Sequence, residues 1–125
     1  MTEQCSITPV AGEKISTALL KMLLASKTNL ILIDARSSKW DDGRRIPGAI
    51  SLTSEASAEE FASTLPQKDA LIAVYCTHAQ CGASSRLAQR LADLGYMNVL
   101  KYAEGIDVWA QQGNRIELNQ GTYEK

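Results

Sequence analysis

The most constraining feature of this chain is the stretch from Leu71 to Tyr96, in which an apolar run, a cysteine loop and an amphipathic run follow one another. The apolar run, Leu71–Tyr75, ends at Cys76. After a loop of small and polar residues, the run from about Ser84 to Leu94 carries apolar residues at helical spacing and is followed by Gly95. This order predicts a buried strand, a tight loop and a helix, with a thiol at the first position of the loop.

The position of Cys76 predicts a reactive thiol. A thiol at that place faces the N–H groups of the loop and the positive end of the following helix, and both stabilise a thiolate over a thiol. We therefore expect a lowered pKa for the Cys76 thiol and a nucleophilic sulfur near neutral pH. A buried and inert thiol at a strand end is the alternative, because free cysteine packs as a small apolar residue.

The rest of the chain alternates between helical and strand patterns. Ser57 and Glu60 form a capping box at the start of one helix, and Pro66 ends it. Further elements are predicted at residues 13–26 (helix), 30–33 (strand), 57–65 (helix), 99–102 (strand) and 106–112 (short helix). We expect one α/β domain over residues 1–125, with a mostly parallel central sheet, helices on both faces and a frayed polar tail after about residue 117.

Length, charge and cysteine content exclude several classes of protein. A chain of 125 residues buries one core without disulfides or metals. With a net charge of -1 it has no basic field for nucleic acid or anionic membranes, and its apolar runs are too short for a membrane span. The first residues lack the features of a signal peptide, so we expect a cytoplasmic protein. In a reducing compartment, a cysteine pair is more often catalytic or redox-active than structural.

Three candidate features fall at one edge of the predicted sheet. Asp34 and Cys76 each stand where a strand ends, and another segment begins after Tyr102. Ligands of open parallel sheets bind beyond the carboxyl ends of the strands. We therefore expect the functional site at this edge.

Three stretches of the chain carry a family resemblance. The first, Leu30–Leu52, has a strand ending in Asp-x-Arg and, some ten residues later, an Ile-Pro-Gly-Ala turn. The second is the strand, cysteine and helix at residues 74–96, and the third is the Gly-Ile-x-x-Trp of Gly105, Ile106 and Trp109. In this order, and over nearly the whole chain, they resemble the rhodanese-like (sulfurtransferase) family.

The resemblance implies a rhodanese-like fold and covalent catalysis by Cys76. Its thiolate would take sulfane sulfur from thiosulfate or a persulfide and pass it to a thiol or cyanide-like acceptor. A protein could also serve as donor or acceptor, and no cofactor or metal is implied. The loop that would cradle the persulfide and bind the substrate comprises Thr77, His78, Ala79, Gln80, Cys81, Gly82, Ala83, Ser84 and Ser85.

The active-site loop departs from the common family pattern, Cys-Arg-x-Gly-x-Arg/Thr. It is longer by about two residues and carries no Arg or Lys between Cys76 and Arg86. It resembles a family variety with a second cysteine five residues on. Because the loop lacks cations, we expect thiosulfate to bind weakly and a neutral or protein-borne donor to work better. Possible supporting residues at the rim are Asp34, Arg36, Arg44 and Arg45.

Two residues of the loop, Cys81 and His78, each have more than one interpretation. Cys81 could resolve or relay the persulfide, or be a small loop residue, and His78 could be a base, a local cation or a loop residue without a role. Asp34 is expected to be structural and to accept hydrogen bonds where the strand ends, and Arg36 is expected to pair nearby. Other residues are predicted to have structural roles. Ser84 and Ser85 are expected to cap the helix, and Trp109, Met22 and the leucines near Met22 are expected in the core.

Three other functions are alternatives to sulfur transfer. A phosphatase or arsenate-reductase-like enzyme needs an Arg six residues after the nucleophile to bind phosphoryl oxygens, and Gly82 stands there. A dithiol redox or sulfide-sensing module would use Cys76 and Cys81. A non-catalytic interaction domain could keep the same fold, because fold alone does not establish activity.

Overall fold

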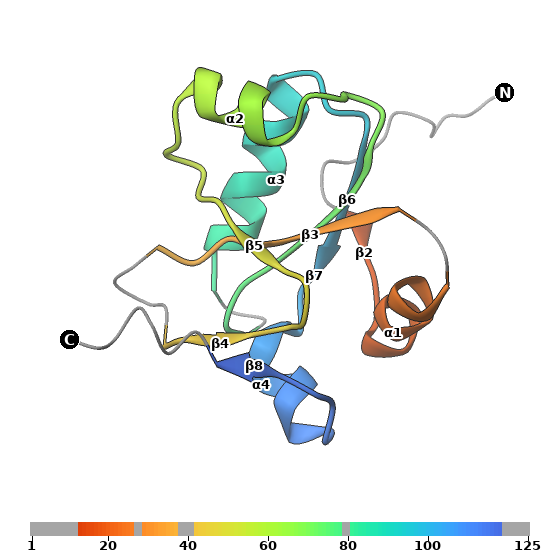
Figure 1. Ribbon diagram of the computed structural model, residues 1–125. Helices are drawn as coiled ribbons and strands as arrows, with labels where there is room; N and C mark the ends of the chain where they lie inside the picture. The colour runs from red at the N-terminus through yellow and green to blue at the C-terminus, as the bar shows by residue number, and fades with distance from the viewer. Residues whose placement is uncertain (1–12, 27–28, 38–41, 79–80, 119–125) are drawn as a thin grey trace, which may run out of the picture.

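A five-stranded sheet organises the molecule (Figure 1). The computed structural model describes residues 13–26, 29–37, 42–78 and 81–118. Within these, the strands run in the order β2-β7-β6-β3-β5 and each neighbouring pair is parallel. The strands are β2 (Glu13–Lys14), β3 (Leu30–Asp34), β5 (Ile50–Ser51), β6 (Leu71–Tyr75) and β7 (Asn98–Tyr102).

Helices cover both faces of the sheet, as predicted. They are α1 (Thr17–Ala25), α2 (Ala58–Thr64), α3 (Ala83–Asp93) and α4 (Gly105–Gln111). The apolar side chains of α2 and α3 pack into one core cluster and those of α1 and α4 into another. Figure 1 shows the four helices arranged around the sheet. The predicted α/β class with a parallel central sheet is therefore confirmed.

The central strand β6 is buried on both faces, which explains its continuous apolar sequence. Ile72 and Val74 belong to the core cluster under α2 and α3, whereas Ala73 and Tyr75 belong to the cluster under α1 and α4. This alternation follows from the two-residue period of a strand. As a result, Cys76 is delivered to the carboxyl edge at the centre of the sheet.

The N-terminal helix is shorter than predicted. Glu13 and Lys14 form the edge strand β2 beside β7, and Ile15 N–H donates to the Lys101 carbonyl at 2.9 Å. The helix begins only after Ser16, whose hydroxyl accepts a hydrogen bond from Leu19 N–H at 3.1 Å. The open backbone edge of β7 therefore decides the conformation of this segment against its helical pattern.

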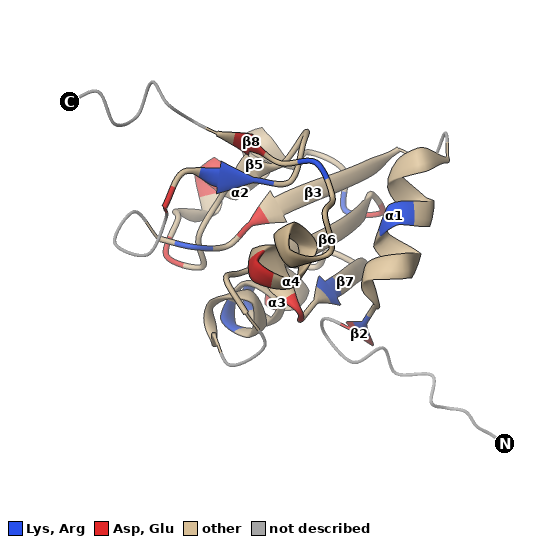
Figure 2. Cartoon of the chain, turned by 90° about the horizontal axis from the view of Figure 1, so that it is seen from below, with Lys and Arg blue, Asp and Glu red and all other residues tan. Residues whose placement is uncertain are grey.

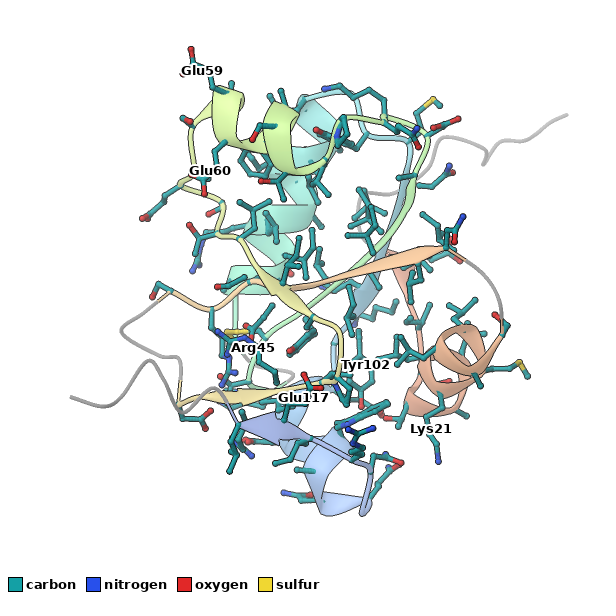
Figure 3. The ribbon with its side chains drawn as sticks, in the orientation of Figure 1. Lys21, Arg45, Glu59, Glu60, Tyr102 and Glu117 are labelled. Carbon is teal, nitrogen blue, oxygen red and sulfur yellow. A yellow bond between two sulfur atoms is a disulfide. The ribbon has the colours of Figure 1, made fainter. Side chains whose placement is uncertain are left out.

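One further prediction fails at the surface. Met22 was expected in the core but its side chain is 66% exposed, because α1 turns Leu20 toward the sheet instead. Near the predicted start of the frayed tail, β8 (Glu117–Leu118) pairs antiparallel with β4 (Arg44–Arg45), and the rest of that tail lies outside the described residues. Arg45 is opposite Glu117 in this register (Figure 3).

The charged residues do not form separate basic and acidic patches in the view of Figure 2. Basic and acidic residues are interspersed there, in keeping with a net charge of -1. Among the residues that the structure describes, none of the helices has the length and apolar character needed to cross a membrane.

Candidate functional site

Cys76 follows directly on β6 and is 2% exposed. Its backbone is fixed by the start of α4: Ile106 N–H donates to the Cys76 carbonyl and Asp107 N–H donates to the Thr77 carbonyl, both at 3.0 Å. The first N–H groups of a helix have no partner within the helix, so they are available for this contact. The segment after Tyr102 thus meets Cys76 at the edge where the sequence predicted the site.

Gly105 makes this close approach possible. Its φ is +78°, and a Cβ at this position would lie 2.5 Å from the Thr77 carbonyl oxygen and 2.7 Å from that of Cys76. A side chain would be strained by the backbone conformation and would also collide with the loop. The glycine of the Gly-Ile-x-x-Trp stretch therefore sets the position of the cysteine loop.

A cleft of about 670 Å³ opens beside Cys76. Four segments form its wall: the end of β3, the connection from β5 to α2, the loop after β6, and the first turn of α3. The lining residues are Arg36, Ser37, Thr53, Ser54, Glu55, Cys76, Thr77, His78, Cys81, Gly82, Ala83 and Arg86.

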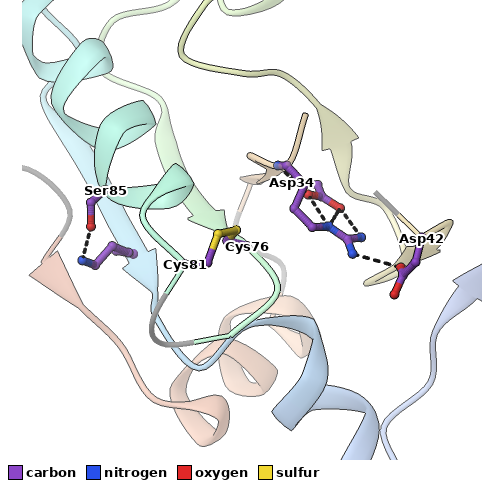
Figure 4. Close-up of a disulfide and its surroundings, with 7 residues drawn as sticks. Asp34, Asp42, Cys76, Cys81 and Ser85 are labelled. Atoms are coloured by element: carbon purple, nitrogen blue, oxygen red, sulfur yellow. Dashed lines mark hydrogen bonds and ion pairs between the residues drawn. A yellow bond between two sulfur atoms is a disulfide. The ribbon is translucent and has the colours of Figure 1, made fainter. Parts of the chain in front are cut away.

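Most of the predicted loop residues line this cleft, and Ala79 and Gln80 lie outside the described residues. The serines do not behave as predicted. The N-cap of α3 is Gly82, without a side-chain cap, because the helix already begins at Ala83. Ser84 is buried inside the first turn, and the Ser85 hydroxyl accepts a hydrogen bond from Lys101 Nζ at 2.7 Å (Figure 4).

Cys76 and Cys81 are joined by a disulfide across the loop (Figure 4). Their α-carbons are 6.3 Å apart, inside the range that a disulfide tolerates. Cys81 N–H donates to the His78 carbonyl at 3.1 Å, which holds Cys81 close to the segment that follows Cys76. The two sulfurs can therefore bond within the fold as it stands.

Asp34 and Arg36, for each of which a structural role was predicted, pair with one another. Arg36 Nη2 donates to Asp34 Oδ2 at 2.8 Å, and Arg36 N–H donates to Asp34 Oδ1 at 2.9 Å. Arg36 also donates to Asp42 from Nη1 at 2.9 Å (Figure 4). Burial opposes the charge on Arg36, but its bonds to the Asp34 and Asp42 carboxylates outweigh burial and raise its pKa above the ordinary value.

Arg44 and Arg45 pair with carboxylates and do not belong to the described wall of the cleft. Arg44 Nη2 lies 2.7 Å from both Asp42 Oδ2 and Asp107 Oδ1, and Arg45 Nη1 lies 3.3 Å from Asp34 Oδ2. Partial burial favours a neutral Asp42, but hydrogen bonds from Arg44 and Arg36 outweigh it and lower the pKa of Asp42 to about 2.

The cleft gains a cation that the sequence reasoning missed. Arg86 lies one turn inside α3 and lines the cleft, with its Nη1 3.0 Å from where a Cβ of Gly82 would lie. Helical side chains point back toward the N-terminus, so the side chain of a residue four positions after the N-cap covers the start of the helix. The direction in which helical side chains point was therefore the signal from which Arg86 could have been predicted. In the described part of the chain, Arg86 forms no ion pair with a carboxylate.

Comparisons with known proteins agree on one family. The model of the Rhodanese-like domain matches residues 16–112, whereas a comparison with curated proteins finds no match. A Bacillus halodurans protein is similar in structure, with a TM-score of 0.75 and 24% identity over 86% of this chain and 78% of the other.

Two further solved structures carry sulfur-transfer names. A thiosulfate sulfurtransferase from Pseudomonas aeruginosa has a TM-score of 0.68 and 19% identity over 87% of this chain, which spans 21% of that protein. A rhodanese from E. coli, determined with anions, has a TM-score of 0.52 and 26% identity over 62% of this chain and 89% of the other. Since the family model matches residues 16–112 of 125, this chain belongs to the rhodanese-like domain family.

Proposed function

We propose that this chain is a sulfurtransferase that carries sulfane sulfur as a persulfide on Cys76. The observation that carries the proposal is the place of Cys76: it directly follows the central strand, lines the cleft, and shares that cleft with Arg86 and the start of α3. The positive end of an 11-residue helix beside a thiol favours the thiolate, which is the nucleophilic form.

Loading of the thiol divides the reaction into two covalent steps. The reduced Cys76 thiolate attacks the outer sulfur of the donor, the new sulfur–sulfur bond forms, and the donor's own bond to that sulfur breaks. With thiosulfate, the leaving group is sulfite, which takes the electron pair of the broken bond. A thiol or cyanide then attacks the outer sulfur of the persulfide, and Cys76 leaves as a thiolate.

Arg86 is the residue that we propose for binding an anionic donor. Its guanidinium matches the oxygens of a sulfonate or a carboxylate, and charged hydrogen bonds of this kind are stronger than neutral ones. The E. coli rhodanese to which this chain is similar was determined with anions. Arg86 would then supply the charge that the loop between Cys76 and Arg86 lacks, and this favours thiosulfate more than the loop sequence alone does.

Thiocyanate formation from thiosulfate and cyanide tests the proposal. The protein is first reduced, so that the Cys76–Cys81 disulfide is open. We expect turnover by the wild-type chain and by Cys81→Ser, and none by Cys76→Ser. Activity that persists in Cys76→Ser would place the nucleophile elsewhere. Absence of turnover in every variant, with thiosulfate and with a small organic persulfide, would favour a non-catalytic domain.

A further inference from the structure

The disulfide between Cys76 and Cys81 assigns a second role to the same cleft. We propose that Cys81 is an internal acceptor: its thiolate attacks the Cys76 persulfide, releases hydrosulfide and closes the disulfide. The domain would then be a sulfide-releasing reductase of sulfane sulfur that works with an external dithiol. This inference rests on the proposed persulfide on Cys76 and specifies where its sulfur goes.

The geometry favours attack on the inner sulfur of the persulfide. Cys76 is held on both sides: Ala35 N–H donates to the Tyr75 carbonyl at 2.8 Å, and Ile106 N–H donates to the Cys76 carbonyl at 3.0 Å. The sulfur of Cys81 bonds directly to the Cys76 sulfur with this backbone in place. Since Cys76 Sγ becomes the inner sulfur after loading, Cys81 reaches that atom without any movement of β6.

The two ends of this disulfide differ in exposure. Cys76 is 2% exposed at the strand end, whereas Cys81 is half-buried at the start of α3. Both line the cleft in which the donor would bind. An external dithiol can therefore approach Cys81 more readily than Cys76, which is the order needed to reopen the bond and free the nucleophile.

Atoms and electrons balance over the cycle. In the release step, a bond forms between Cys76 Sγ and Cys81 Sγ, and the bond between the inner and outer persulfide sulfurs breaks. The outer sulfur leaves as hydrosulfide with the electron pair of the broken bond, and the two cysteines together are oxidised to a disulfide. A dithiol protein or small dithiol then reduces the disulfide by thiol–disulfide exchange, taking the oxidation onto itself.

A single-turnover experiment without reductant tests the inference. Cys5→Ser serves as the background, because it removes the third thiol of the chain. The reduced, desalted protein is mixed anaerobically with one equivalent of thiosulfate, and intact mass and free sulfide are measured. We expect the background protein to lose two hydrogens and release one sulfide per chain. Adding Cys81→Ser should give a stable gain of one sulfur and no sulfide.

Different results overturn different claims. Peptide mapping locates any extra sulfur that the background protein retains. If that sulfur is on Cys76 or on Cys81, the internal release step is wrong, but the proposed persulfide is not. If sulfide is released equally without Cys81, another acceptor is responsible and the inference fails. If neither protein gains sulfur or releases sulfide, the proposed sulfurtransferase function fails, and this inference fails with it. A sample without thiosulfate must keep its mass throughout.

Discussion

Arg86 illustrates how a single side chain can change the chemistry expected of a loop. Read in sequence order, the loop after Cys76 has no cation, and Arg44 and Arg45 were the candidates for the rim. In the fold, those two arginines neutralise Asp42, Asp107 and Asp34, while Arg86 turns back over the helix start and lines the cleft. Spacing along the chain led to Cys76 as the proposed nucleophile but not to the cation beside it.

Replacing Arg86 by Gln should weaken the use of thiosulfate selectively. We expect the KM for thiosulfate to rise about tenfold, the effect of losing one charged hydrogen bond, and the KM for an uncharged organic persulfide to change little. Steady-state kinetics with both donors measures the difference. The reason is that only the anionic donor offers oxygens to the guanidinium.

Arg115→Gln is the matched control for Arg86. It makes the same change of charge at an exposed arginine that lies outside the described lining of the cleft. Both KM values should stay near those of the wild-type chain. If Arg86→Gln raises the KM for both donors equally, Arg86 stabilises the start of α3 and does not bind the anionic donor.

At the scale of elements, α4 positions Cys76, the proposed nucleophile, although it contributes no residue to the described lining of the cleft. Its first N–H groups hold the carbonyls of Cys76 and Thr77, and this contact depends on the missing side chain of Gly105. The Gly-Ile-x-x-Trp stretch is thus a clamp on the cysteine loop.

Gly105→Ala should therefore destabilise the fold and slow sulfur loading together. A methyl group at φ +78° costs about 1–2 kcal/mol, and its collision with the Thr77 carbonyl adds about 1–3 kcal/mol. Urea unfolding and the rate of persulfide formation measure the two effects.

Gly113→Ala is the control, because Gly113 has nearly the same φ, +80°, but nothing within 4 Å of a Cβ. It should cost only about 1–2 kcal/mol, the price of the backbone conformation, and leave loading unchanged. Equal losses of stability in the two variants would contradict the clamp.

The long elements could be predicted from the sequence because their patterns agree with their surroundings. The continuous apolar run of β6 and the Ser57 cap of α2 are examples, and the cap is seen in the 3.0 Å bond from Glu60 N–H to Ser57 Oγ. The two-residue strands β2, β4 and β8 carry no periodic signal. They exist because a distant strand offers a free backbone edge, which no local pattern shows.

The whole molecule is tied together at the site by alternating charges. Arg36 joins Asp34, at the end of β3, to Asp42, and Arg44 joins Asp42 to Asp107 in α4. These contacts link the sheet edge, β4 and α4 around the cysteine loop. Because Asp34 and Arg36 are buried, the ion pairs near them are less screened than surface pairs.

This network predicts a loss of stability in acid. The pKa of Asp42 is lowered from 3.8 to about 2 in the folded chain. Its contribution to the free energy of unfolding is therefore complete above the unfolded value and is lost as the pH falls through about 2. Urea unfolding between about pH 5 and pH 2 should show a shallower pH dependence in Asp42→Asn than in the wild-type chain. Identical slopes would show that the Asp42 pairs add nothing to stability.

The central claim is that sulfur is carried on Cys76, and the most direct measurement locates the sulfur itself. Thiosulfate labelled in its outer sulfur is mixed with the reduced Cys81→Ser chain, in which we expect the persulfide to persist. The protein is then digested under non-reducing conditions, and the labelled peptide is identified by mass. The account predicts label on the peptide that contains Cys76, and release of that label as thiocyanate when cyanide is added. Label on the peptide that contains Cys5, or no bound label at all, would contradict it.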